Sequence, residues 1–319
     1  MAIQVGAFRE VALTKESTPR TAETPAAGDF INHSGHSFRP EVPKIEQVGA
    51  KGNISGVHRT DIINQRCMGS IPMDLEQSKL WLLGTLLMGT DPVTTGVGPY
   101  THNWDTLQND NDHQTFTVSY TDKNVGDKAS PGALLDKLTL DANIGQYVTA
   151  MLDMVGLEEE AGTYTPSYNS ANETYFVPAD MTFKLATNYA GLGAANAIAI
   201  DQLTAEINKN VKSHYAAGAL GPVRSINERM TGGGSFHILN ENTTYRDLAH
   251  ADTTRAMSIN LTSGNYQLTL EFPTITITNY AEDEDPDTYV GDTLEFKIDD
   301  RDTTNGLLKV EVIDDASSH

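Results

Sequence analysis

The chain has 319 residues, 39% of them apolar, so it can bury the core of two ordinary domains or of one large β domain. Its formal net charge of −21 excludes sequence-independent gripping of nucleic acid, which needs clustered lysine and arginine. The single cysteine excludes an internal disulfide, and no stretch has the pattern of a signal peptide or a membrane-spanning helix. We therefore expect a soluble product of a reducing cytoplasm.

Residues 1–43 are rich in Thr, Pro, Ala, Gly and Ser and have no regular apolar period. Such a composition predicts an extended N-terminal arm that becomes ordered only against a neighbouring subunit. The arm contains His33 and His36, but two histidines are too few ligands for a metal site. We predict no metal here.

Alternation of polar and apolar residues begins at residue 44 and predicts strands over 44–57 and 61–75, interrupted by glycines at 49, 52 and 56. A helix is predicted over 74–89, with Asp74 and Gln77 as a capping box and Gly89 as its stop. Its leucines form one wide apolar arc that should pack on a sheet. Trp81 and Met88 form a second, smaller apolar spot. They are either core residues or contacts with another subunit.

Further strands with one apolar face follow on both sides of residue 162. Alternation is clear over 114–120, 134–140 and 148–154, and again over 257–261, 266–272, 275–277, 294–298 and 308–312. A short helix is predicted near 243–251. We expect residues 44–162 and 163–319 to form two halves of a mainly β protein. Each strand should have one buried face and one face exposed to solvent.

A phrase in the first half is nearly repeated in the second. Ile63-Asn64-Gln65-Arg66-Cys67-Met68-Gly69 returns as Ile226-Asn227-Glu228-Arg229-Met230-Thr231-Gly232, and each copy leads into an alternating segment and a candidate helix. Repetition of a whole supersecondary unit indicates that the fold is duplicated. Arg66 and Arg229 should occupy matching positions near subunit or half-to-half boundaries.

No catalytic or cofactor-binding signature is present. The sequence lacks nucleophile-elbow, zinc-protease and phosphate-loop motifs, and residues 232–234 are a glycine run that precedes a strand rather than a helix. The acidic run at 282–287 lacks the ligand spacing of a calcium loop and is typical of a solvated hairpin tip. We predict no enzyme activity, no cofactor and no metal.

The order of these features resembles the tail tube proteins of tailed bacteriophages and related viruses, from about residue 44 to the end. The features that carry the resemblance are Gly69-Ser70-Ile71-Pro72 before the helix, Tyr100-Thr101-His102 before a strand, Gly132-Ala133, Glu206-Ile207-Asn208-Lys209-Asn210, Arg229-Met230-Thr231-Gly232 and Leu270-Glu271-Phe272-Pro273. The resemblance implies a β-sandwich or barrel fold with a flanking α-helix, here duplicated. The inner strands of neighbouring subunits would join into a closed β-barrel, and the rings would stack into a hollow tube for DNA.

Ring closure would also remove the exposed strand edges that a chain of this kind must protect. The resemblance implies self-assembly as trimeric pseudo-hexameric or hexameric rings, with Trp81, Met88, Arg66 and Arg229 as interface candidates. The implied partners are the tape measure, tail terminator and baseplate proteins and double-stranded DNA in transit, with no membrane. The implied location is the virion tail, after assembly in the host cytoplasm. The alternatives are another tail component, such as a terminator or baseplate protein, and a β-sandwich binding module.

Overall fold

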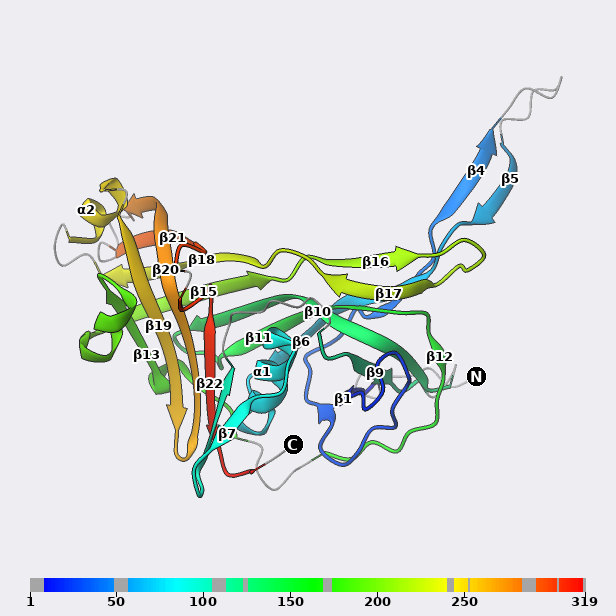
Figure 1. The fold of residues 1–319 in the computed structure, drawn as a ribbon, viewed down its shortest axis with the longest axis horizontal. Coiled ribbons are helices and arrows are strands. Elements are labelled where there is room, and N and C mark those ends of the chain that lie inside the picture. Colours follow the sequence, from blue (N-terminus) through cyan, green and yellow to red (C-terminus); the bar gives the residue numbers. More distant parts are fainter. Residues whose placement is uncertain are drawn as a thin grey trace.

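The computed structural model in Figure 1 describes residues 9–48, 57–104, 113–122, 126–168, 174–239, 244–251, 253–282, 291–302 and 304–317. The protein is mainly β, as expected, with a few short helices. Its strands form two sets, and two hairpins lie beside or beyond them (Figure 1).

The first set consists of β1 (Val11–Lys15), β2 (Phe30–Ile31), β3 (Arg39–Glu41), β6 (Arg66–Asp74), β9 (Phe116–Tyr120), β10 (Lys128–Asn143) and β11 (Thr149–Gly156). Antiparallel pairings arrange these strands in the order β2–β1–β9–β10–β11–β6–β3. The long β10 pairs with β9 at its start and with β11 further along, so it joins two groups of strands. The short β12 (Glu160–Ala161) pairs with the start of β10.

The second set consists of β13 (Met181–Ala186), β14 (Ala197–Ile198), β15 (Ile200–Asn208), β18 (Thr231–Leu239), β19 (Thr254–Ser263), β20 (Tyr266–Glu282) and β21 (Gly291–Ile298). Their antiparallel order is β14–β13–β19–β20–β21–β18–β15. Like β10, the long β20 pairs with different strands along its length. A side ladder extends from its first part through β22 (Lys309–Asp314), β8 (Tyr100–Trp104) and β7 (Val93–Thr95).

The two sets have the same strand order. Each strand of the first set has a counterpart at the same place in the second: β2 and β14, β1 and β13, β9 and β19, β10 and β20, β11 and β21, β6 and β18, and β3 and β15. Each set also has a hairpin at the same place. The hairpin of β4 (Lys44–Val48) and β5 (Val57–Ile62) lies between β3 and β6, and that of β16 (Val211–Tyr215) and β17 (Pro222–Asn227) lies between β15 and β18. The sets meet where β10 pairs with β15.

The pairings among the described strands do not close on themselves, so a single copy has no closed barrel. In the described part of the chain, no helix has the length and apolar character needed to cross a bilayer.

The main helix, α1 (Leu80–Met88), is shorter than the sequence predicts. The capping box at Asp74 and Gln77 is wrong, because β6 continues to Asp74, and the backbone of Leu75 and Gln77 still bonds to Val148 and Thr174. The 3₁₀ turn η2 (Gln77–Lys79) then leads into the helix. The predicted stop is confirmed: Gly89 is left-handed (φ 72°), and its N–H bonds to the carbonyl of Thr85.

Helix α1 lies between β22 and β8 on one side and β10 on the other (Figure 1). Every residue of α1 except Trp81 is buried, as expected for a helix that is apolar on all sides. Gly84 lets the helix approach β8 closely, since a Cβ at this position would lie 2.7 Å from the Trp104 ring. The structure also describes the helix α2 (Thr244–His250), near the predicted position, and the 3₁₀ turns η4 (Pro178–Asp180) and η5 (Tyr189–Ala194).

The description of residues 1–43 as an arm ordered only by a neighbour is wrong for the part that the structure describes. Strand β1 pairs with β9 and β2 within the same copy, and its Val11 and Leu13 belong to the core. Phe30 and Phe38 are also buried. The physical reason is that the short apolar runs around these residues cover strands from distant parts of the chain. Residues 9–43 are therefore integral to the first strand set.

Candidate assembly surfaces

Six strands, β6, β11, β10, β15, β18 and β21, lie side by side and have one apolar and one polar face. The apolar face carries buried side chains such as Leu138, Leu140 and Ile207. The polar face carries the alternate residues, among them Thr149, Thr204 and Ser235. We call the polar side of these six strands the polar face. It extends across the boundary between the two strand sets.

Cross-strand contacts bind this polar face together. The Lys137 ammonium lies 3.9 Å from the Asp153 carboxylate on β11 and 3.6 Å from the Glu206 carboxylate on β15. The Thr204 hydroxyl donates to Asp141 at 2.6 Å. Each such contact contributes modestly, but together they fix neighbouring strands in register.

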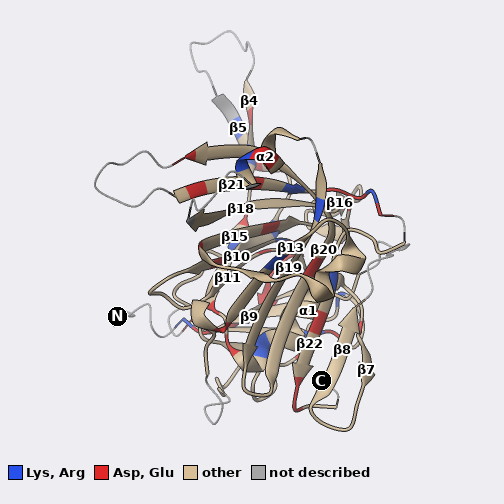
Figure 2. Cartoon of the chain, turned by 90° about the vertical axis from the view of Figure 1, so that its left-hand side faces the viewer, with Lys and Arg blue, Asp and Glu red and all other residues tan. Residues whose placement is uncertain are grey.

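Acidic residues outnumber basic ones on the polar face, and Figure 2 colours both kinds on the strands. The acidic residues are Asp74, Asp141, Asp153, Glu206 and Glu295, and the basic residues are Arg66, Lys137 and Lys297. The face is therefore hydrophilic with an acidic balance.

The glycine run at 232–234 belongs to this sheet, at the start of β18. A Cβ on Gly233 would lie 2.6 Å from the Phe296 carbonyl oxygen, and one on Gly234 would lie 2.0 Å from the Thr204 carbonyl oxygen. These glycines permit close strand packing between β15 and β21.

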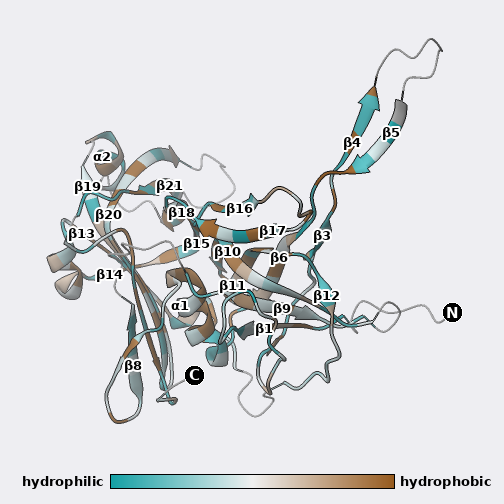
Figure 3. Cartoon of the chain, turned by 45° about the vertical axis from the view of Figure 1, so that its right-hand side comes forward, coloured by the Kyte–Doolittle hydropathy of each residue, from teal (hydrophilic) through white to brown (hydrophobic). Residues whose placement is uncertain are grey.

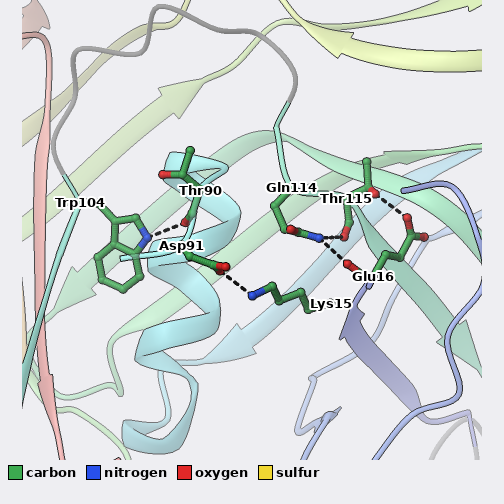
Figure 4. Close-up of polar contacts among 7 residues, drawn as sticks. All are labelled: Lys15, Glu16, Thr90, Asp91, Trp104, Gln114 and Thr115. Atoms are coloured by element: carbon green, nitrogen blue, oxygen red, sulfur yellow. Dashed lines mark hydrogen bonds and ion pairs between the residues drawn. The ribbon is translucent and has the colours of Figure 1, made fainter. Parts of the chain in front are cut away.

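A groove of about 680 Å³ lies beside the start of α1 and includes Trp81 among its lining residues. Trp81 is half-buried, and the Lys15 ammonium lies 5.4 Å from the centre of its ring, in a cation–π contact. Lys15 also pairs with Asp91 at 2.5 Å (Figure 4). Trp81 thus lies at the surface of its own copy, held by β1.

The other interface candidates from the sequence lie elsewhere. Met88 is fully buried in the core, so its predicted outward position is wrong: α1 packs against β22, β10 and β8. Arg66 begins β6 and pairs with Glu41 on β3 at 3.0 Å. Arg229 is exposed just before β18, and its carbonyl accepts a hydrogen bond from Asn210. The two arginines follow corresponding hairpins: Arg66 is the first residue of β6, and Arg229 lies just before β18.

The hairpins carry a second kind of surface. Figure 3 shows β4–β5 standing away from the body of the molecule, whereas β16–β17 lies beside β10. Exposed apolar side chains on or next to the hairpins are Val42, Ile45, Val48, Ile62 and Ile63 at the first and Tyr215, Leu220 and Val223 at the second. Such a row of exposed apolar groups on a projecting element marks a protein contact surface.

The described residues do not meet the requirements of a metal site or of a reactive thiol. Among the residues that the structure describes, no three His, Cys, Asp or Glu side chains are placed to hold a metal ion. Cys67 is buried, and burial raises the pKa of its thiol to about 12, which makes it unreactive. Most of the acidic run at 282–287 lies outside the described residues.

Comparison with known proteins gives one family. A family model described as phage tail tube protein matches residues 6–298, nearly the whole chain. No curated protein matches the chain. This match agrees with the mainly β fold of the chain. The chain therefore belongs to the phage tail tube protein family, whose members are structural components of the virion tail and not enzymes.

Proposed function

We propose that this tail tube protein assembles into stacked rings in which the polar face lines a central channel for the phage genome. The observation that carries this proposal is the polar face that extends across both strand sets. Its hydrophilic side chains suit a water-filled channel, and its acidic balance repels DNA phosphates, so that DNA passes without being held. Closing the sheet into a barrel by joining several copies would remove its free edges.

We further propose that each ring contains three copies, in which two fused halves take the places of six subunits. Support comes from the matching strand orders and from the matching places of the two hairpins. We keep the division between residues 162 and 163 as the proposed boundary between the halves. The first half, however, includes β1, β2 and β3 from the segment previously assigned to the arm.

The further partners implied by this role are the tape measure, tail terminator and baseplate proteins of the same tail. Assembly would take place in the host cytoplasm before the tail joins the virion. A tube of identical rings needs a separate protein to set its length and others to close its ends. The exposed hairpins and the ends of the polar face are surfaces that such partners could contact.

A cross-section of the assembled tube tests the proposal. Purified protein at high concentration should form tubes, and electron cryo-microscopy should resolve three copies in each ring with the polar face toward the channel. The barrel should look nearly six-fold, while the layer outside it alternates between α1, which packs against β8 and β22, and α2. Six copies of the full chain in each ring would refute the fused pseudo-hexamer, and a channel lined by the apolar face would refute the assigned lumen.

Trp81 tests the groove beside α1 as a contact between copies. Covering a half-exposed aromatic side chain at an interface contributes on the order of 2 kcal/mol. Trp81→Ala should therefore raise the protein concentration needed for tube formation while changing the melting temperature of the monomer little. Trp104, which is buried and bonded through its indole N–H to the Thr90 carbonyl (Figure 4), is the matched control. Trp104→Ala should lower the monomer melting temperature. An equal loss of monomer stability for both variants would make Trp81 a core residue.

A further inference from the structure

The junction between the two strand sets is a contact between halves that the structure defines residue by residue. Strand β10 pairs antiparallel with β15, with Thr139 opposite Glu206 and Asp141 opposite Thr204. The second hairpin reinforces the junction, because the backbone N–H of Gln65 donates to the Leu220 carbonyl at 2.9 Å. The first half thus offers the edge of β10, and the second half covers it with β15 and a hairpin.

The matching strand orders identify the counterpart of each edge. The repeated phrase aligns β6 with β18 and thereby Pro72 with Ser235. Pro72 lies opposite Met151, and Met151 lies opposite Thr139. In the second set, Ser235 lies opposite Glu295, which in turn lies opposite Asn279. Asn279 on β20 is therefore the counterpart of Thr139 on β10.

The counterpart of Glu206 follows from the same alignment. Glu206 lies opposite Gly233 on β18, and the repeated phrase aligns Gly233 with Ser70 on β6. The backbone N–H of Ser37 donates to the Ser70 carbonyl at 3.0 Å. Ser37, just before β3, is therefore the counterpart of Glu206 on β15.

These two counterparts lie on edges that no described strand covers. Strand β19 pairs with β20 only as far as Thr276, so the edge of β20 from Asn279 to Glu282 pairs with β21 on one side alone. The segment around Ser37 pairs only with β6. Asn279 and Ser37 are both exposed. In the first half, by contrast, the edge of β10 is covered by β15.

We propose that neighbouring copies in the ring pair in the same way as β10 and β15 pair inside one copy. The edge of β20 from Asn279 to Glu282 pairs antiparallel with residues 34–37 of a second copy. In this register Asn279 lies opposite Ser37. This proposal rests on the proposed ring, and it specifies which residues lie opposite one another where two copies meet. The first hairpin then lies over the β20 of the next copy, as β16–β17 lies over β10 within one copy. This position would cover the exposed Ile45 and Ile62.

One difference separates the two junctions. Inside a copy, the buried Lys209 of the second half donates to the Leu86 carbonyl on α1 of the first half at 2.7 Å. Continuing the alignment from Glu206 and Ser37, the counterpart of Lys209 is Pro40, which has no ammonium group. The junction between copies therefore lacks this link.

A cysteine pair tests the register in the full chain. Opposed residues on antiparallel strands have Cα atoms about 4.5–5.5 Å apart, within the range of a disulfide. Asn279→Cys with Ser37→Cys should therefore shift the chain, after oxidation of assembled tubes, from the monomer band to covalent dimers and trimers on a non-reducing gel. The native Cys67 is buried and should give no background. Mixing the two single variants should give dimers, whereas neither alone should.

Two matched pairs serve as controls. Thr139→Cys with Glu206→Cys is the equivalent pair within one copy and should form its disulfide without any change of oligomer. Asn279→Cys with Arg39→Cys shifts the pair by two residues on the same face, to about 7–8 Å, and should leave the chain as monomer. Crosslinking of this shifted pair in place of the opposed pair would overturn the register.

Electron microscopy of the same samples under reducing conditions tests ring formation independently of the proposed pairing between copies. Three-copy rings in which the opposed pair stays monomeric on oxidation would overturn the proposed pairing while leaving the proposed ring intact. Failure of the wild-type chain to form any ring would overturn the proposed function and this junction with it.

Discussion

Replacing Glu16 by alanine should lower the free energy of unfolding by about 3–5 kcal/mol, because the change leaves several buried donors without an acceptor. The Glu16 side chain is 2% exposed, and its carboxylate accepts hydrogen bonds from the backbone N–H of Arg20 and of Gly132 (2.7 Å) and from the hydroxyls of Thr115 and Thr117. It thereby joins the residue after β1 to Thr115 before β9 (Figure 4), to Thr117 on β9 and to Gly132 on β10. Urea unfolding of the monomer measures the loss.

Glu23 provides the matched control for Glu16. Its carboxylate accepts from the backbone and hydroxyl of Ser17 at the surface, so Glu23→Ala should change stability little. Both residues belong to the segment that the sequence predicts as an arm. A Glu16→Ala variant with wild-type stability would mean that this segment does not support the fold of its own copy.

Lys209 should make stability depend on pH. Burial lowers the pKa of its ammonium to about 7, whereas a lysine in the unfolded chain titrates near 10.4. Between these values the unfolded state binds the extra proton, so the free energy of unfolding should rise as the pH rises from about 7 to about 10. The full rise is at most about 5 kcal/mol.

Lys209→Met removes this dependence. Below pH 7 the variant should be at least as stable as the wild type, because it buries no charge. Above pH 10 it should be less stable by about 1 kcal/mol, the loss of the hydrogen bond to the Leu86 carbonyl. The two stability curves should therefore cross. Lys212→Met, at an exposed position on β16 beside Glu228, should keep the wild-type dependence on pH. Parallel curves for wild type and Lys209→Met would show that Lys209 does not titrate in this window.

Local patterns in the sequence were enough to predict the class of the fold and much of its surface chemistry. Alternation gave the one-sided strands of both sets, such as β9 and β19, because side chains on a strand point to opposite faces in turn. Gly89 gave the end of α1, since a left-handed residue after a helix favours glycine. The absence of catalytic motifs and the order of the elements pointed to a tail tube protein.

The start of α1 and the positions of its side chains could not be read from the same patterns. Asp74 and Gln77 have the spacing of a capping box, but the strand ladder to β11 continues through Asp74 and offers more hydrogen bonds than a cap. A helical wheel separates Met88 from the leucines, yet the sheet encloses the helix from several sides and buries both. Amphipathic periodicity shows which residues share a face and does not show how many faces are covered.

By itself, the sequence determined that this is a mainly β tail tube protein with one-sided strands, a glycine-terminated helix and a repeated phrase. Only the tertiary structure decided which strand edges pair. It showed that β1 pairs with β9 of its own copy and that β15 pairs with β10. It also showed that, beyond Thr276, the edge of β20 opposite β21 has no partner among the described strands. The physical reason is that the alternation of polar and apolar residues specifies the face of the sheet on which each side chain lies. The hydrogen bonds that join two strands are made by the backbone, which is the same for every residue type except proline, so the sequence pattern does not identify the partner strand. Partners distant in the chain are therefore selected by the packing of the whole molecule.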